Sequence, residues 1–226
     1  MRQVYEDRFN ANFEVFHNFA DSKLLPLKST LYKKFSDESP LKLLFIGSIF
    51  QHLHKGAIQD ICRAVRELND SGKPITFSMY GQVIPSNYLN DEIDNISVFH
   101  HGEIKAEERF LTMEQYHAFV VPSSFDSDLS INYSLSIPTK LPELLGSGRP
   151  TLIYGPPNME ANGFCRKLNT GIVIEKEGIN SLKKELSYLL ENYNFEVIKA
   201  QSDLTRNTSH IFGNEVKNKF KKFILN

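Results

Sequence analysis

The sequence has 226 residues, of which 41% are hydrophobic and 23% charged, and its formal net charge is −1. This composition is that of a globular protein, and the near-neutral charge gives no field of one sign that would favour a nucleic acid partner. No apolar run approaches the roughly 18 residues of a membrane span, and we expect no signal peptide. The two cysteines, Cys62 and Cys165, lack metal-ligand spacing, so we expect buried, reduced thiols of a cytoplasmic protein.

Residues 1–38 differ in pattern from the rest of the chain. Arg2–Phe9 can form one or two helical turns, and Phe13–His17 alternates as a short strand does. A polar passage with prolines, Asn18–Pro40, then shows no sustained period. We interpret residues 1–38 as a linker or the remnant of a preceding unit, and we place the main domain at residues 39–194.

From Leu41 onward, short apolar runs alternate with segments in which apolar residues recur at helical spacing. The apolar runs predict strands at residues 41–47, 75–80, 96–99, 118–121, 151–154 and 171–174. The other segments predict helices at residues 56–68, 106–116, 160–168 and 179–193. This alternation is typical of an α/β fold, and we expect a Rossmann-like parallel sheet of about six strands with helices on both faces. Ligands of such sheets bind beyond the carboxyl ends of the strands.

Residues 195–226 are expected to add helices at 196–203 and 213–225 that pack back on the domain or toward another part of the protein. The last segment, Lys217–Asn226, is basic and carries apolar residues at helical spacing. Such a helix could touch an anionic membrane, but we expect it chiefly to face the core.

A short helix is predicted between residues 139 and 148, and its start could bind an anion. Thr139 is a good N-cap residue, and Pro142 fits the first turn. The backbone amides that would suit a phosphate or diphosphate, beside the Lys140 ammonium, are those of Thr139, Lys140 and Leu141. Glu143, about one turn further on, could accept hydrogen bonds from a ribose. An ordinary capped helix with an exposed glutamate is the alternative.

The loop after the first strand offers another phosphate contact. Gly47 permits close approach of the backbone, and Lys55 brings a charge near the strand end. The loop has neither the glycine pattern of a dinucleotide site nor that of a Walker loop. On its own, Lys55 fits a solvated lysine at a helix start better than a ligand contact.

Two further patterns could carry chemistry. Asp126–Ser127–Asp128 spells an Asp-x-Asp motif, which can share a divalent cation with a diphosphate. Because this motif is common by chance in polar loops, we expect no metal ion and no cofactor. His100 and His101 could donate hydrogen bonds near a sugar, although a histidine pair at a strand end is more often structural. No role in a site is expected for His52, His54 and His117.

Together the motifs resemble the C-terminal, donor-binding half of GT-B glycosyltransferases of the retaining family 4 type, also called glycosyl transferases group 1. The pieces that carry this resemblance, in chain order, are Leu43–Gly47, Lys55–Gly56, Ser78–Gly81, Val98–Ile104, Ala118–Asp126 and Pro138–Pro150. They lie within residues 41–192 in the order and spacing that the family shows.

The resemblance implies roles for individual residues. Those implied at the donor diphosphate are Gly47, Ser48, Lys55, Thr139, Lys140 and Leu141. Those implied at the nucleoside are Gly81, Gly102, Glu103, Ile104 and Glu143, with Glu143 on the ribose. The implied catalytic residues are Asp126, in contact with the transferred sugar, and Glu143.

This chain departs from the family at two places. Ser48 stands where the family usually has arginine, so one charged contact to the diphosphate is lost. Asp126 and Glu143 are farther apart than the two acidic residues of the family, so residues 127–137 would have to loop out as an insertion.

These patterns lead us to expect the donor-binding domain of a glycosyltransferase. It would transfer a sugar from a nucleoside diphosphate sugar to a polysaccharide, lipid-linked or other acceptor, free in the cytoplasm or at the inner face of a membrane. The N-terminal GT-B half would act in cis or in trans, and this chain alone would turn over little or nothing. The alternative is a non-catalytic nucleotide- or protein-binding module of the same fold, which Ser48 and the changed acidic spacing favour.

Overall fold

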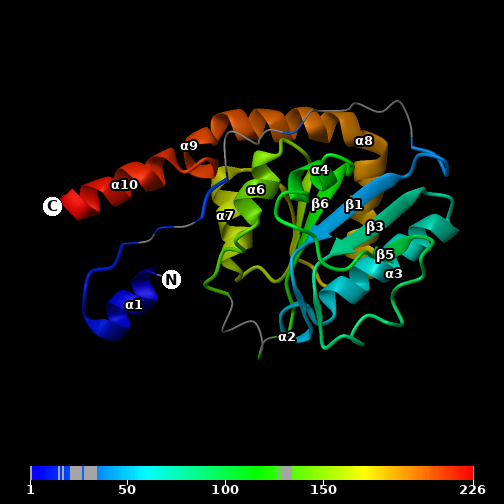
Figure 1. The fold of residues 1–226 in the computed structure, drawn as a ribbon, viewed down its shortest axis with the longest axis horizontal. Helices are drawn as coiled ribbons and strands as arrows, with labels where there is room; N and C mark the ends of the chain where they lie inside the picture. Colours follow the sequence, from blue (N-terminus) through cyan, green and yellow to red (C-terminus); the bar gives the residue numbers. More distant parts are fainter. Residues whose placement is uncertain are drawn as a thin grey trace.

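A computed structural model of the chain describes residues 2–14, 16, 18–20, 27, 35–126, 128 and 134–225. Its centre is a six-stranded parallel sheet with the strand order β5-β3-β1-β6-β7-β8, and helices cover both faces (Figure 1). The strands of this sheet are β1 (Leu41–Ile46), β3 (Ile75–Tyr80), β5 (Val98–His100), β6 (Ala118–Pro122), β7 (Thr151–Tyr154) and β8 (Ile172–Ile174). The predicted α/β fold with a parallel sheet is therefore confirmed.

The helices and a small second sheet surround this centre. The helices that follow the strands are α2 (Gln51–His54), α3 (Ala57–Asp70), α4 (Arg109–Met113), α6 (Leu141–Gly146), α7 (Glu160–Leu168), α8 (Ile179–Arg206) and α9 (Thr208–Ile211). The second sheet pairs β2 (Ile49–Phe50) with β4 (Val83–Ile84) in parallel, directly after β1 and β3. The sequence did not predict this pair, because two residues are too few to show an alternation.

Alternate residues of β1 enter two separate core layers. Leu41, Leu43 and Phe45 pack with residues of α3 and the first part of α8. Leu44 and Ile46 pack on the other face, with residues of α6, α7 and the end of α8. Because successive side chains of a strand point to opposite faces, a strand covered on both faces reads as a continuous apolar run. The two cores thus explain why β1 could be recognised in the sequence.

Two helices differ from their predicted bounds. Only Arg109–Met113 of the predicted helix 106–116 is α-helical, and turns flank it on both sides. The predicted helices 179–193 and 196–203 are joined in α8, which is kinked at Asn192 (φ −119°, ψ 22°). The expected boundary between residues 194 and 195 therefore falls inside a helix.

Both cysteines are buried and unbridged, as expected. Burial raises the pKa of the Cys165 thiol to about 12, and it raises the pKa of Cys62 as well. Both side chains belong to the core layers, Cys62 to the layer of α3 and Cys165 to the layer of α7.

The two ends of the described chain lie outside the sheet layers. The predicted N-terminal helix is confirmed as α1 (Arg2–Phe9), whereas Phe13, Glu14 and Phe16 are not in a strand and Val15 and His17 lie outside the described residues. At the other end, α10 (Asn214–Leu225) extends away from the sheet (Figure 1).

The apolar side of α10 stays exposed, so this helix does not face the core, and its packing toward another part of the protein stays a prediction. Phe220, Phe223 and Ile224 are 48%, 60% and 61% exposed. The ring of Phe16 contacts Phe220 and Phe223 at centroid distances of 5.2 and 5.9 Å. Within the described residues, no helix combines the length and the apolar character that crossing a membrane requires.

Candidate functional site

The carboxyl ends of β1, β3 and β5 are joined by backbone hydrogen bonds. The Gly47 N–H donates to the Tyr80 carbonyl (2.9 Å), and the Gly81 N–H donates to the Gly102 carbonyl (2.7 Å). Gly81 has a φ of +138°, and a Cβ at this position would collide with the Gly47 carbonyl oxygen. Only glycine permits this close approach, which brings the three strand ends into one surface.

Two cavities open on this surface and share a wall. The β1–β6 cavity, of about 290 Å³, lies between β1 with α2 on one side and β6 with the start of α6 on the other. The β1–β3 cavity, of about 300 Å³, lies beyond the ends of β1 and β3 and reaches α4. The residues that line both cavities are Ile46, Ser48 and Lys140. A single elongated ligand could therefore occupy both.

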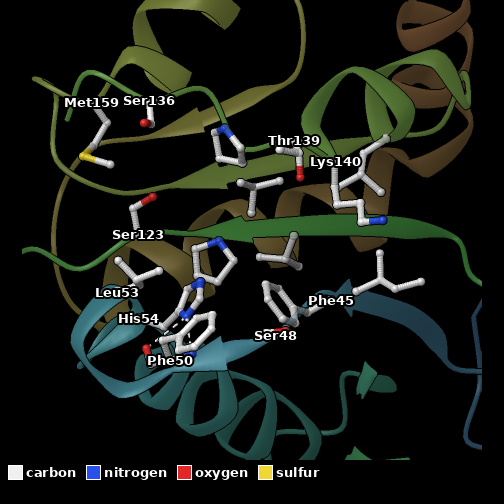
Figure 2. A pocket seen from close by; sticks show the side chains of 16 residues that line it. Phe45, Ser48, Phe50, Leu53, His54, Ser123, Ser136, Thr139, Lys140 and Met159 are labelled. Carbon is white, nitrogen blue, oxygen red and sulfur yellow. Dashed lines mark hydrogen bonds between the residues drawn. The ribbon is translucent and has the colours of Figure 1, made fainter. Parts of the chain in front are cut away.

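Figure 2 shows the β1–β6 cavity from close by. Thr139 and Lys140 lie on one side of it, and Ser48, Phe50 and His54 lie on the other. Ser48 lies two residues after the end of β1, and Thr139 and Lys140 directly precede α6, 91 and 92 residues later in the chain (139 − 48 and 140 − 48).

His54 is a neutral wall residue of the β1–β6 cavity. Its Nδ1 accepts a hydrogen bond from the Phe50 N–H (3.1 Å), and its ring contacts Phe45 at 5.5 Å. Burial lowers the pKa of His54 to about 4, so the imidazole is uncharged at neutral pH. His54 thus lines the cavity although no sequence pattern marked its position, and the prediction that it has no role in a site stays a prediction.

Three charged side chains lie close together beside the cavities: Lys140 lines both, Arg109 lines the β1–β3 cavity, and Glu143 lines neither but pairs with Arg109. The Arg109 Nη2 donates to the Glu143 Oε1 over 2.9 Å, and these side chains are only 19% and 18% exposed. Burial lowers the pKa of the neighbouring Lys140, as does the positive charge of Arg109, while Glu143 acts in the opposite direction. Two cations and one carboxylate leave the cluster with one net positive charge, which suits an anion.

Arg109 is the residue of this cluster that the sequence analysis missed. It lies 34 positions before Glu143 and opens α4, which the sequence showed only as an amphipathic segment. Its guanidinium stacks over the Phe110 ring at 4.9 Å. The neighbouring Arg109–Phe110 pair is a weak signal, because only the folded sheet brings α4 beside α6.

The structure gathers most of the predicted residues around the two cavities. Those that line the β1–β3 cavity are Gly47, Ser48, Gly81, Glu103, Ile104 and Lys140. Thr139 lines the β1–β6 cavity, and the Gly102 carbonyl accepts the hydrogen bond from Gly81. Glu143 lines neither cavity, and its connection to the β1–β3 cavity is the bond that it accepts from Arg109.

Two expectations about the start of α6 are wrong. Lys140, not Thr139, precedes the helix, and no side chain caps its N-terminus. The Leu141 N–H donates to the Pro138 carbonyl (3.0 Å), so this amide is not free for a phosphate. The Pro138 carbonyl closes a turn just ahead of the helix. It accepts the hydrogen bond from a helix-start amide that the Thr139 hydroxyl was expected to accept.

Lys55 and Asp126 come together, but beside the cavities rather than in them. The Lys55 Nζ lies 3.3 Å from the Asp126 Oδ2, with the two side chains 58% and 33% exposed. Neither residue lines either cavity. The Asp128 N–H also donates to Asp126, whereas Ser127 and residues 129–133, most of the expected insertion, lie outside the described residues. Among the described residues, no group of three His, Cys, Asp or Glu side chains could hold a metal ion.

The histidine pair at the end of β5 contacts the neighbouring strand β3 and its following glycine. The His100 Nε2 is 2.7 Å from the Gly81 carbonyl oxygen, and the His101 Nε2 is 3.1 Å from the Ser78 Oγ. His101 also stacks on Tyr80 at 4.6 Å. These contacts agree with a structural pair, since neither ring lines a cavity.

Comparison with known proteins places this fold. No protein-family model matches the sequence, and the search of curated proteins found no significant match. Among solved structures, the C-terminal domain of a glycosyl transferase group 1 family protein (LpcC) from Francisella tularensis aligns over 84% of this chain and 97% of that domain, with 14% identity and a TM-score of 0.57. TarM from S. aureus aligns over 98% of this chain and 41% of its own, with 15% identity and a TM-score of 0.67. Sucrose-phosphate synthase from Thermosynechococcus elongatus aligns over 98% and 55%, with 11% identity and a TM-score of 0.65.

The chain therefore has the fold of the C-terminal domain of GT-B glycosyltransferases, as the resemblance of its motifs implied. It spans almost all of the separate LpcC domain but only 41% to 57% of the longer TarM, sucrose-phosphate synthase and WaaG chains.

Proposed function

We propose that this chain is the donor-binding domain of a glycosyltransferase and binds a nucleoside diphosphate sugar at the carboxyl edge of its sheet. The observation that carries the proposal is the wall shared by the two cavities: Ser48 and Lys140 line both, Arg109 lines the β1–β3 cavity, and Glu143 pairs with Arg109. The β1–β3 cavity would take the nucleoside, the junction of the two cavities the diphosphate, and the β1–β6 cavity the sugar.

Three of the five predicted nucleoside residues support this division, whereas Gly102 and Glu143 do not line the cavity. Backbone groups of Gly81, Glu103 and Ile104 would contact the base, because these residues line the β1–β3 cavity. One oxygen of the Glu143 carboxylate holds Arg109. A carboxylate has about four acceptor sites, so Glu143 can accept hydrogen bonds from the ribose hydroxyls as well.

Solved structures of the same fold support a nucleotide ligand. TarM was crystallised with UDP, the pneumococcal O-GlcNAc transferase GtfA with UDP and GlcNAc, and HepE from Anabaena with UDP. These proteins share only 12% to 15% of residues with this chain over the aligned regions. We therefore carry over the class of ligand, a nucleoside diphosphate sugar, and leave base and sugar to experiment.

The chemistry that this domain can offer is electrostatic. When the sugar is transferred, negative charge grows on the leaving diphosphate, and fixed cations in a half-buried site stabilise that charge. Lys140 lies at the junction, where the leaving group would sit. This route requires no metal ion. Lys55 and Asp126 keep their predicted roles toward the diphosphate and the sugar only if a bound ligand separates their ion pair.

The acceptor site would lie on a second Rossmann-like half, supplied in cis or in trans. The longer chains of this fold contain about as much again beyond the part that aligns with this one. Transfer to a polysaccharide, lipid-linked or other acceptor, with surface polysaccharide synthesis as the expected setting, would need both halves. This chain alone would bind the donor and turn over little or nothing.

Contact with an anionic membrane surface is also proposed, through α10. The helix carries Lys217, Lys219, Lys221 and Lys222 together with the exposed apolar side chains of Phe220, Phe223 and Ile224. A basic helix with an exposed apolar side lies in the plane of a lipid interface, its apolar face among the acyl chains. Such a contact would hold the enzyme at the inner face of a membrane, near a lipid-linked acceptor.

Calorimetric titration tests the donor site. Of UDP, GDP and ADP, we expect one to bind, and we expect its 2′-deoxy analogue to bind about tenfold more weakly because one hydrogen bond to a charged group is lost. Glu143→Ala should abolish this preference for ribose. The matched control is Glu191→Ala on α8, a 68% exposed glutamate that pairs with Lys73 and lines neither cavity. No heat with any nucleotide at millimolar concentration would refute the donor site, and a Glu143→Ala variant that still prefers ribose would refute the role of Glu143.

The second candidate function is a non-catalytic nucleotide- or protein-binding module. Two observations favour it: Ser48 brings no charge to the cavities, and Asp126 lies outside them. The two functions differ in the fate of a sugar nucleotide. A donor domain completed by its second half consumes the bound sugar nucleotide, whereas a binding module leaves it intact after hours of incubation.

A further inference from the structure

We propose that Arg109 binds the diphosphate of the donor and, with Lys140, provides the positive charge that Ser48 cannot. This inference rests on the proposed function and assigns the charged contact within the same site. Ser48 and Arg109 both line the β1–β3 cavity, and Lys140 is shared by the two cavities. An anion at the junction would therefore lie within reach of both cations.

The guanidinium of Arg109 has unused donors. It carries five N–H groups in a fixed plane, and the bond to the Glu143 Oε1 uses one of them. The Nε atom is buried and has no hydrogen-bond partner among the described residues. The stacked Phe110 ring, 4.9 Å away, keeps the guanidinium plane fixed.

The net positive charge of the three side chains also favours binding of an anion. Arg109 and Lys140 repel each other, and Glu143 compensates only one of them. Planar guanidinium groups bind phosphate through two parallel hydrogen bonds, which makes arginine a stronger phosphate ligand than lysine. A diphosphate at the junction would balance the remaining charge and would leave Glu143 held by Arg109 for the ribose.

Other cations are less well placed for this role. Lys55 is 58% exposed, pairs with Asp126 and lines neither cavity. Lys105 lines the β1–β3 cavity, but it is exposed to solvent, where an ionic contact contributes little. Arg109 is thus the half-buried arginine at the cavity wall, and it comes from α4 instead of the loop after β1.

The test compares a nucleoside diphosphate with its nucleoside. Calorimetry of the whole chain with whichever of UDP, GDP or ADP binds should show that Arg109→Gln lowers the affinity for the diphosphate at least tenfold and the affinity for the nucleoside less than threefold. Arg63→Gln is the matched control, since Arg63, which lies on α3, pairs with Glu92 and lines neither cavity. Ser48→Arg added to Arg109→Gln should recover at least threefold of the lost affinity.

Each result decides the inference. If the wild-type chain binds none of the nucleotides, the proposed function fails and the inference with it. If the wild type binds but Arg109→Gln weakens diphosphate and nucleoside equally, or neither, Arg109 only positions Glu143 and the inference alone is wrong. A double variant no better than Arg109→Gln would also contradict it. Arg109→Lys keeps the stacking and the charge, so it replaces Arg109→Gln if that variant does not fold, and it should lose affinity for the diphosphate only.

Discussion

The carboxyl edge of the sheet and the outer side of α10 both present aromatic and basic side chains, but they are held in different ways. At the carboxyl edge, hydrogen bonds of Gly47 and Gly81 join three strand ends, and Arg109 is fixed by an ion pair and a stacked ring. On α10, the rings of Phe220 and Phe223 contact Phe16 and remain about half exposed.

From this difference we expect the two regions to bind different kinds of partner. Groups fixed by backbone hydrogen bonds and half-buried ion pairs are preorganised, so a ligand of defined shape binds them at little cost in entropy. Exposed apolar side chains on a peripheral helix suit a partner without defined shape, such as a lipid surface. Substitutions should therefore reduce stability at the carboxyl edge and leave it unchanged on α10.

The largest effect on stability is expected at Gly81. Gly81→Ala places a Cβ against the Gly47 backbone at a φ of +138°, so two strand ends must move apart. We expect a loss of at least about 2 kcal/mol in the free energy of unfolding, together with loss of nucleotide binding. Gly72→Ala is the control, because its φ is +76° but no atom lies within 4 Å of the added Cβ. It should cost only about 1 kcal/mol. Urea unfolding measures both, and equal losses would contradict the close approach.

The carboxyl edge also shows how far the sequence could predict this protein. The strands β1, β3, β6 and β7 were found because both faces of each are covered, which leaves an apolar run that the sequence displays. The alternation of these strands with helices predicted a parallel sheet. The parallel sheet in turn predicted the carboxyl edge, where Ser48, Gly81 and Lys140 line one cavity.

The misses have a common physical cause. Arg109 and His54 became site residues through partners and cavities that exist only after folding, and neither residue type marks a cavity by its spacing. The predicted capping role of Thr139 was wrong because a backbone carbonyl, that of Pro138, can accept the hydrogen bond from the same amide as a side-chain cap would. A choice of this kind depends on local geometry that composition does not determine.

A smaller effect on stability is expected from pH through His117. This ring is 5% exposed, and its Nδ1 accepts the Lys42 N–H over 2.8 Å. Burial lowers its pKa to about 4, against about 6.5 in the unfolded chain. Between these values the unfolded chain binds more protons, so the stabilising contribution is complete above pH 6.5 and declines as the pH falls.

Urea unfolding at several pH values tests this expectation. The wild-type chain should lose about 1.5 kcal/mol more than His117→Asn between pH 6.5 and pH 5. Asparagine is the suitable replacement, because its amide oxygen can accept the Lys42 N–H without titrating. Equal pH dependence of the two proteins would show that the imidazole is not held neutral by the fold.

The smallest effect on stability, and the sharpest contrast with Gly81, is expected on α10. The double variant Phe223→Ser/Ile224→Ser should change the free energy of unfolding by less than about 0.5 kcal/mol, because the two side chains are 60% and 61% exposed. The double variant should nevertheless co-sediment less than the wild type with vesicles of phosphatidylglycerol. Neither the wild type nor the variant should bind vesicles of phosphatidylcholine.

The control for this experiment lies on α8. Phe195 and Ile198 are each 59% exposed, so Phe195→Ser/Ile198→Ser removes the same chemistry from a helix that lacks the row of lysines. This control should bind anionic vesicles as the wild type does. Equal losses in the two double variants would indicate a general hydrophobic effect. A large loss of stability in the α10 variant would instead mean that its apolar side packs against protein, and the contrast between the two regions would then fail.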